Sequence, residues 1–425
     1  MNKHSIIKSA RINEQYTKIK HSSGLTMLLY PMEGFSGTYA LFGTKYGSVD
    51  TRFKTGTDDN FLQVPEGIAH FLEHKMFESE DGDAFAKYAK TGASANAYTS
   101  FDRTAYLFSC TENFAQSLEI LLECVTTPYF TDQTVQKEMG IIGQEIKMYE
   151  DDPNWRVYFN TMRALYHYHP LRIDIAGTVE SISEIDADML YRCYNTFYNL
   201  GNMVLCIAGN FEIDTVTEIA DRMLKPAKDV VIERRNLKEP SSVYTEKIEQ
   251  ILPVAIPLFT VAFKADPAAE EQNAINQIMD ELLIDIIAGE ASPLYRRLYD
   301  SGLINSEFGG EAMSSRDYSL TMFMGESRDP EAVKAEIISE ITHVRKDGID
   351  PSAFSSCKKG IYGGHVSTFG RVESVASAML SSYFSGVEIY DIIDKLAAIT
   401  IDDLQKRLEN SFDITRCAMS IVKGE

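Results

Sequence analysis

The spacing of apolar and polar residues changes several times between the two-residue period of strands and the 3.6-residue period of helices. In the first half, an apolar strand is predicted from Tyr39 to Tyr46, followed by a helix from Ile68 to Phe77 that is apolar on nearly all sides. A strand pair follows from Ala93 to Cys110, and a long helix is predicted to begin at Glu112. This order of strand, helix, strand pair and helix forms one structural unit.

The second half repeats the same order of elements. A strand is predicted from Leu258 to Phe263, a helix from Ala268 to Ile287, a strand pair from Ile304 to Gly325, and a helix from Asp329. Self-similarity of this kind indicates an internal duplication.

The duplication suggests a division into two domains. Asp102 and Asp317 lie in corresponding turns of the two strand pairs, at an offset of 215 positions. Between the halves, residues 229–243 are polar, as in a surface linker. We therefore predict an N-terminal domain of residues 1–228, a linker of residues 229–243 and a C-terminal domain of residues 244–425. Alternating strands and helices suggest α/β or α+β domains, each a sheet packed against helices on one side.

The most specific chemical signal lies inside the first apolar helix, where the sequence reads His70-Phe71-Leu72-Glu73-His74. Two histidines four positions apart on a helix lie about 40° apart on one face, where both rings can bind one metal ion. Glu73 lies about 60° to the other side of His70, where its carboxylate can reach a water at the metal. Buried in an apolar helix, these side chains need partners, and a shared cation satisfies all three. The order is typical of an inverted zinc-peptidase motif.

A catalytic zinc site usually has three protein ligands and one open position, so a third ligand is expected on another element. The sequence predicts a helix from Asp132 to Tyr149 that carries Glu138 and Glu145, seven positions and hence about 20° apart on one face. Apolar residues lie on or near that face, namely Ile141, Ile142, Ile146 and Met148. They favour a buried role for at least one glutamate, although a solvated acidic face is the alternative interpretation.

With both helices in place, the chain resembles the pitrilysin or insulinase-like zinc peptidases, the inverzincins, in a half-length form similar to bacterial processing peptidases. That family carries a second helix with two glutamates seven apart, of which the later one binds zinc. The resemblance implies that His70, His74 and Glu145 bind Zn²⁺, that Glu73 is the general base, and that Glu138 orients a ligand or the water. It also implies an α+β fold of two tandem homologous domains, each a mixed β-sheet packed against helices.

Candidate substrate contacts follow from the same resemblance. The segment Ser94–Ser100 resembles the family's active-site strand, an edge strand that pairs with an extended peptide. This similarity implies contacts from Asn96 and from the backbone near Ala97, while an ordinary edge strand is the alternative. The family often places an arginine and a tyrosine seven positions apart on a further substrate-contacting segment. Arg296 and Arg297 are the candidates here, but neither is followed by a tyrosine at that spacing, and a surface-helix role is an equal alternative.

Composition limits the class of protein. A chain of 425 residues with 44% hydrophobic residues can bury large cores, and no apolar run is long enough to cross a membrane. A formal net charge of -21 argues against binding to nucleic acid or to an anionic membrane surface. The six cysteines show no spacing typical of zinc knuckles or redox dithiols. The basic start of the chain lacks the apolar core of a secretory signal, so a cytoplasmic location is expected.

The predicted function is that of a zinc-dependent metalloendopeptidase that hydrolyses unstructured oligopeptides or peptide precursors within a chamber. Family chambers contain four domains and this chain has two, so we expect a homodimer or a heterodimer with a homologous chain that lacks the motif. The second-half segment Ala274–Glu281, which matches the metal helix, has no histidine and is expected to support the first domain. The alternatives are a catalytically silent chamber-forming or scaffold subunit and a peptide-binding module with a structural metal.

Overall fold

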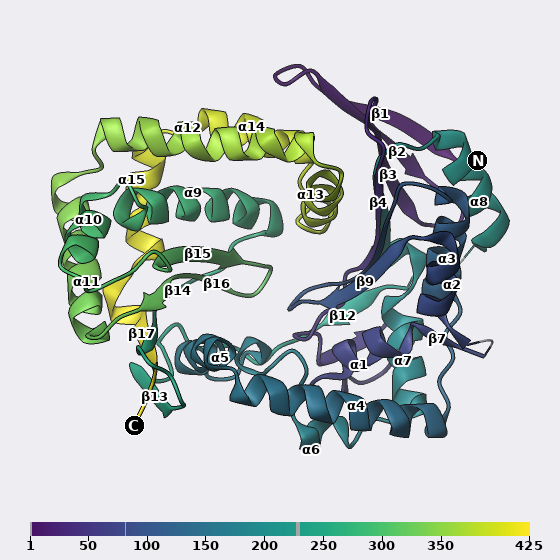
Figure 1. Ribbon diagram of the computed structural model, residues 1–425, viewed down its shortest axis with the longest axis horizontal. Coiled ribbons are helices and arrows are strands. Elements are labelled where there is room, and N and C mark those ends of the chain that lie inside the picture. Colours follow the sequence, from purple (N-terminus) through teal and green to yellow (C-terminus); the bar gives the residue numbers. More distant parts are fainter. Residues whose placement is uncertain (1, 81, 227–229) are drawn as a thin grey trace.

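Two mixed β-sheets form the two halves of the molecule in the computed structural model, which describes residues 2–80, 82–226 and 230–425 (Figure 1). The first sheet has seven strands in the order β1-β2-β3-β11-β4-β10-β9. Its neighbouring strands are antiparallel except β3 and β11, which run parallel. The order places β9 at an edge of the sheet. The strands are β1 (Lys3–Ser9), β2 (Glu14–Lys20), β3 (Thr26–Pro31), β4 (Thr38–Thr44), β9 (Ser94–Thr99), β10 (Thr104–Cys110) and β11 (Met203–Gly209).

The second sheet has the same pattern with fewer strands, in the order β13-β17-β14-β16-β15. Its single parallel pair, β13 with β17, takes the place that β3 and β11 have in the first sheet. The hairpin of β15 and β16 corresponds likewise to that of β9 and β10. The predicted duplication of a mixed sheet is therefore confirmed. The strands are β13 (Lys247–Ile251), β14 (Leu258–Ala265), β15 (Gly309–Ser314), β16 (Ser319–Glu326) and β17 (Cys417–Lys423).

Two small sheets complete the strands, in the order β12-β5-β6 and as the pair β7-β8. Strand β12 lies inside the segment predicted as a linker, where it pairs antiparallel with β5. The predicted boundary at residues 228 and 229 lies outside the described residues, and the division into domains stays a prediction. These strands are β5 (Arg52–Thr55), β6 (Leu62–Gln63), β7 (Glu78–Ser79), β8 (Gly82–Asp83) and β12 (Ile232–Arg234).

The helices follow the predicted order, and none of those in the described residues is long and apolar enough to cross a membrane. The first-half helices are α1 (Ile68–Lys75), α2 (Ala84–Thr91), α3 (Phe114–Thr126), α4 (Asp132–Asp151), α5 (Pro153–Leu165), α6 (Val179–Ile182), α7 (Ala187–Phe197) and α8 (Ile213–Met223). The second-half helices are α9 (Glu270–Ala288), α10 (Pro293–Asp300), α11 (Pro330–Asp347), α12 (Pro351–Ser367), α13 (Val372–Phe384), α14 (Ile389–Ala398) and α15 (Ile401–Ser411). Short 3₁₀ helices are η1 (Pro170–Arg172), η2 (Leu200–Asn202), η3 (Thr368–Gly370) and η4 (Ile414–Arg416).

One helix boundary differs from its prediction. The helix expected to begin at Glu112 begins at Phe114, because Asn113 adopts a left-handed backbone with φ of 55°. Asparagine tolerates this conformation better than most residues, so it ends the preceding turn and starts the helix.

Helices of its own half cover one side of each sheet, as expected, and a helix of the other half covers the second side. One face of the first sheet packs on its own helices, while the other packs on α13 from the second half, through Met379 and Leu380. A Cβ atom at Gly43 would lie 2.4 Å from Leu380 Cδ1, which shows how closely α13 approaches β4. In the same way α5 from the first half covers the second sheet, through Phe159 and Met162. The two halves therefore exchange one helix each.

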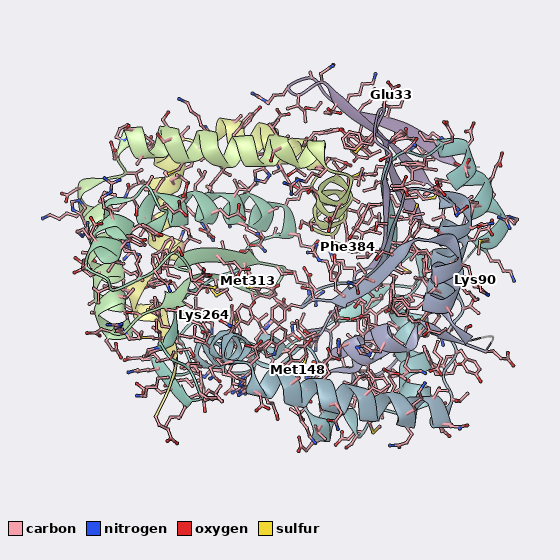
Figure 2. The ribbon with its side chains drawn as sticks, in the orientation of Figure 1. Glu33, Lys90, Met148, Lys264, Met313 and Phe384 are labelled. Atoms are coloured by element: carbon pink, nitrogen blue, oxygen red, sulfur yellow. The ribbon has the colours of Figure 1, made fainter. Side chains whose placement is uncertain are left out.

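Two lysines, one in each half, bind the ends of the exchanged helices. Lys264 on β14 donates to the carbonyl oxygen of Leu165, the last residue of α5, over 3.0 Å (Figure 2). Lys45, which follows β4, donates to the carbonyl oxygen of Phe384, the last residue of α13, also over 3.0 Å. Cations are favourable at a helix C-terminus, where carbonyl groups lack partners within the helix. Each exchanged helix therefore ends on a lysine of the half that it covers, although the two lysines occupy different positions in the register of their strands.

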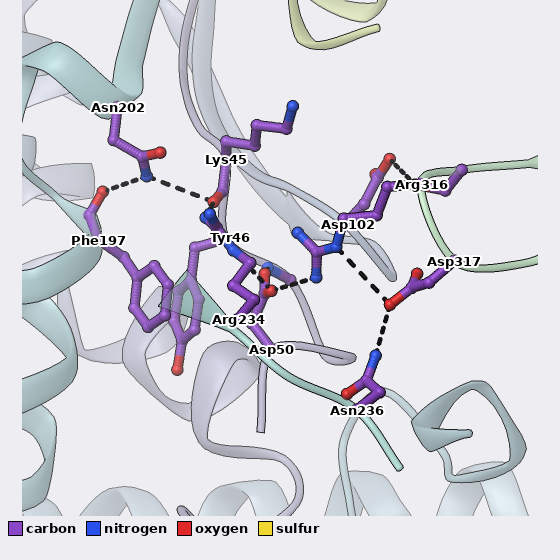
Figure 3. A network of polar contacts seen from close by, with 12 residues as sticks. Lys45, Tyr46, Asp50, Asp102, Phe197, Asn202, Arg234, Asn236, Arg316 and Asp317 are labelled. Carbon is purple, nitrogen blue, oxygen red and sulfur yellow. Dashed lines mark hydrogen bonds and ion pairs between the residues drawn. The ribbon is translucent and has the colours of Figure 1, made fainter. Parts of the chain in front are cut away.

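A polar network joins the halves near the turn between β15 and β16 (Figure 3). The fully buried Asp50 carboxylate accepts from Arg234 Nε over 2.9 Å and from Arg316 Nη2 over 2.6 Å. Asn236 donates to Asp317 in the same turn. Because Arg316 and Asp317 belong to the second half, these contacts hold its hairpin turn against Asp50 in the segment between β4 and β5 and against Asn236, which follows β12.

Candidate metal centre

Helix α1 carries the His-x-x-Glu-His motif in a buried position. It begins after Gly67, which has a left-handed φ of 87°, and a Cβ atom there would lie 2.3 Å from the carbonyl oxygen of Ala176. Only glycine fits both conditions. The exposed fractions of His70 and Glu73 are 9% and 8%, so the motif faces the protein interior.

Helix α4 brings a third side chain to the two histidines. His70 Nε2 lies 3.7 Å from Glu145 Oε1, and His74 Nε2 lies 3.4 Å from Glu145 Oε2. One ligand atom from each of the three residues falls within 4.8 Å of the others. In a tetrahedral zinc site with bonds near 2.0–2.1 Å, two ligand atoms are about 3.3 Å apart. The cluster is therefore close to the size that a zinc ion requires.

Two hydrogen bonds hold the cluster from outside. Glu138 Oε1 lies 3.0 Å from His74 Nδ1, the ring nitrogen that faces away from Glu145. The hydroxyl of Tyr149 donates to Glu145 Oε1 over 2.8 Å. Carboxylate contacts of this kind fix the tautomer and orientation of metal-binding histidines. His70 Nδ1, by contrast, is buried and has no hydrogen-bond partner in the described part of the chain.

The pKa shifts in the cluster agree with a site built for a cation. Burial, together with the charge of neighbouring His74, lowers the pKa of His70 to about 4. Burial also opposes the charged form of His74, but the hydrogen bonds to Glu138 and Glu145 outweigh it and raise its pKa to about 10. The contact with His74 lowers the pKa of Glu145 to about 2. Two carboxylates thus surround one positive charge.

Glu73 stands apart from the three clustered residues. Its Oε2 atom accepts from Thr99 Oγ1 on β9 over 2.8 Å, which ties α1 to the edge strand. Burial raises the pKa of Glu73 above its ordinary value, despite the opposing hydrogen bond from Thr99. A carboxylate with a raised pKa beside a candidate metal site can take up and return a proton near neutral pH.

Strand β9 lies beside the cluster with one edge free of strand pairing in the described residues. Asn96 on this strand is exposed, and its Oδ1 atom accepts from the backbone N–H of Ala97 over 2.9 Å. A cavity of about 700 Å³ has both Asn96 and Ala97 in its wall, together with Glu73 and His74. The wall also contains apolar side chains, namely Phe77, Phe85 and Ile141. The structure thus brings the motif and the edge strand to one cavity.

Arg296 and Arg297 are not part of this cavity. They lie on α10, on the opposite side of the molecule from α1 (Figure 1). Arg296 is exposed, and Arg297 forms ion pairs with Glu340 over 2.7 Å and with Glu336 over 3.6 Å. Their predicted contact with substrate stays a prediction.

Two contact residues were not singled out in the sequence. Tyr149 follows Glu145 by four positions on the same helix, a spacing that could have indicated the contact. Thr99 lies within the segment already assigned to the edge strand, but its contact with Glu73 joins two elements and has no signal in a local pattern.

Known proteins with similar sequences and structures agree with the sequence analysis. The profile of the insulinase family (peptidase family M16) matches residues 63–179, and that of the peptidase M16 inactive domain matches residues 184–361. The uncharacterized zinc protease YmfH of Bacillus subtilis is 38% identical over 415 residues, covering 96% of this chain and 97% of that protein.

Solved structures show the same relationship. An M16-like peptidase from Alicyclobacillus acidocaldarius has a TM-score of 0.92 and 33% sequence identity, over 100% of this chain and 99% of that chain. Pitrilysin has a TM-score of 0.77 and 18% identity, and the match covers 99% of this chain but 46% of pitrilysin. The family profiles and the full-length relatives together show that this chain belongs to the insulinase family, peptidase family M16, in its half-length form.

Proposed function

We propose that the protein is a zinc-dependent metalloendopeptidase. The observation that carries the proposal is the cluster of His70, His74 and Glu145, placed beside the buried Glu73 and next to the free edge of β9. Membership of a peptidase family and relatives named zinc proteases support it.

In this proposal His70, His74 and Glu145 hold Zn²⁺, and Glu138 fixes the ring of His74. Zinc supplies a Lewis acid that polarises the scissile carbonyl and lowers the pKa of a water to about 7. The described cysteines are all free thiols, and none belongs to the cluster, so protein ligands leave a coordination position open. An open position is the property of catalytic rather than structural zinc sites.

Glu73 is the proposed general base. Its carboxylate takes the proton of the attacking water and then delivers it to the leaving amine. The hydrogen bond from Thr99 holds the carboxylate at the cavity wall, and burial keeps its pKa above the ordinary value. Both properties suit a group that must accept and donate a proton in one cycle.

The proposed substrates are unstructured oligopeptides and peptide precursors. A peptide can pair with the free edge of β9 only when its own backbone is extended, which excludes rigid folded domains. Asn96 and the backbone of Ala97 would contact this peptide beside Glu73 and His74. The apolar wall formed by Phe77, Phe85 and Ile141 favours a large apolar side chain next to the cleaved bond.

We further propose that two chains form the active chamber. The match to pitrilysin covers less than half of that protein, so a chamber of pitrilysin size requires two chains of this length. The partner is a second copy or a homologous chain without the motif, and it would supply the substrate contacts of the arginine and tyrosine pair that this chain lacks. The free thiols fit the reducing cytoplasm, and the acidic charge disfavours nucleic acid and anionic membrane surfaces as partners.

A timed digest of mixed unstructured peptides, mapped by mass spectrometry, tests the proposal. The wild-type chain should cleave with one bound zinc, and Glu73→Gln should keep zinc but lose nearly all turnover. Glu180→Gln, an exposed carboxylate on α6, is the matched control and should cleave like the wild type. Full turnover in Glu73→Gln would remove the base mechanism. Zinc binding without any cleavage by the wild type would favour a silent subunit or a peptide-binding module.

A further inference from the structure

A second cavity lies between α4, α5 and the segment that follows η1. Its volume is about 280 Å³, which is the liquid volume of about nine waters. Three arginines contribute to its wall: Arg156 and Arg163 from α5 and Arg172 from η1. The first two are seven positions apart and therefore lie on one face of α5.

None of these arginines forms an ion pair in the described residues, although the chain has 62 acidic residues. Arg156 Nε donates to the side-chain oxygen of Gln250 over 3.4 Å. Arg172 Nε is buried without a hydrogen-bond partner, and its guanidinium lies 5.5 Å from the ring centre of Tyr244. A guanidinium stays protonated in proteins, so the three positive charges cannot be removed by titration.

The cavity wall also contains Glu66, Glu150 and Asp174, but these carboxylates do not pair with the arginines. Asp174 accepts from Trp155 Nε1 and from the backbone N–H of Ala176. Burial raises the pKa of Asp174, and burial together with the charges of Arg156 and Arg172 lowers the pKa of Arg163. The charges of Asp174 and Glu150 oppose this lowering of the Arg163 pKa, so the carboxylates of the wall offset part of the positive charge without pairing with the guanidinium groups.

We propose that this cavity binds a compact phosphate-type anion. Guanidinium groups present rigid pairs of N–H donors that match the oxygens of phosphate, and charge-assisted bonds of this kind are about twice as strong as neutral ones. An anion in the cavity would relieve the repulsion among the three like charges in its wall. The ligand is free phosphate or the phosphate end of a larger molecule.

A fluorescent side chain, Trp155, contacts the wall of the cavity and can report on ligand binding. Trp155, the single tryptophan of the chain, donates to Asp174 in the cavity wall and stacks on Tyr149 at 4.5 Å between ring centres. Tyr149 in turn donates to Glu145 of the metal cluster. Ligand binding should therefore change the fluorescence of Trp155. The site itself is separate from the proposed zinc ligands, so its test does not depend on peptidase activity.

The experiment titrates inorganic phosphate into the full-length protein, with and without zinc, and follows Trp155 fluorescence and heat of binding. Saturable binding that is the same without zinc is expected. Arg163→Gln and Arg172→Gln should each weaken it about 10- to 100-fold, the loss expected for a hydrogen bond between charged groups. Arg328→Gln, an exposed arginine after β16, is the matched control and should bind like the wild type. Calorimetry with ADP and tripolyphosphate distinguishes free phosphate from the phosphate end of a larger molecule.

Three outcomes would overturn the proposal. The first is the absence of saturable binding of any of these phosphates up to about 10 mM, which is weaker than a specific site of this kind should show. The second is an equal response to chloride at the same ionic strength, which would indicate screening. The third is unchanged affinity in both cavity variants when their circular dichroism shows that they fold.

Discussion

Replacing Lys264 by methionine should destabilise the protein far more than the same change at Lys45, which binds the end of the other exchanged helix. The exposed fraction of Lys264 is 4%, and its ammonium donates to three backbone carbonyls and to Glu239 over distances of 2.7 to 3.0 Å. Methionine is similar in length but supplies no donor. It would leave Glu239, with an exposed fraction of 14%, without its cation.

The loss of folding stability in each variant depends on how deeply its ion pair is buried. Removing one partner of a buried ion pair costs about 3–5 kcal/mol, because the other charge stays buried without its counter-ion. Three backbone N–H groups still donate to Glu239, so the loss should lie at the lower end of this range, about 3 kcal/mol. Lys45 is 26% exposed and its partner Glu270 is 40% exposed, so solvent screens this pair. Its loss, together with one hydrogen bond to Phe384, should cost about 1 kcal/mol.

Urea unfolding at pH 7, followed by circular dichroism, measures both variants against the wild type. The expected result is a large fall in the midpoint for Lys264→Met and a small fall for Lys45→Met, with similar slopes. Equal losses within about 0.5 kcal/mol would refute the reasoning, since burial would then not decide the cost. A loss below about 1 kcal/mol for Lys264→Met would refute it as well.

Other predictions concern the metal centre, the pH dependence and the assembly. Glu138→Gln should weaken zinc binding about 10- to 100-fold, measured by competition with a chelator, because it loosens the hold on His74. Burial raises the pKa of Glu239, but hydrogen bonds from Lys264 and from backbone N–H groups outweigh it and hold the pKa below the ordinary 4.5. Its stabilising contribution should be complete above pH 4.5 and disappear as the pH falls through the lower folded-state pKa, with a smaller acid sensitivity in Lys264→Met. Sedimentation of the active form should show two chains per particle, and a fully active monomer would contradict the shared chamber.

The local part of the site could be predicted from the sequence, because helical geometry alone relates its residues. His70 and His74 share a face at a spacing of four, and α4 runs from Asp132 as the apolar pattern indicates. Glu138 and Glu145 share a face at a spacing of seven, and the structure places both beside His74.

The exchange of α5 and α13 could not be predicted. Their apolar faces show that both helices are buried. The sequence around Phe159 and Met379 does not indicate which of the two sheets each helix covers. The cavity lined by three arginines could not be predicted from the sequence for a related reason. Arg156 and Arg163 share a helix face, but Arg172 joins them only because the chain turns back through η1.

The second half shows how the same fold buries polar groups without a metal. Asp280 of α9, in the segment that corresponds to the metal helix, is fully buried. Arg407 of α15 donates to its two carboxylate oxygens over 2.8 and 2.6 Å, and Ser411 donates to one of them. A bidentate arginine satisfies a buried carboxylate within the protein itself. In the first half, the buried carboxylate of the corresponding helix α1 is Glu73, which accepts from the hydroxyl of Thr99. The two halves therefore satisfy a buried carboxylate on this helix in different ways: an arginine and a serine bind Asp280 in the second half, and a threonine binds Glu73 beside the cluster of His70, His74 and Glu145 in the first.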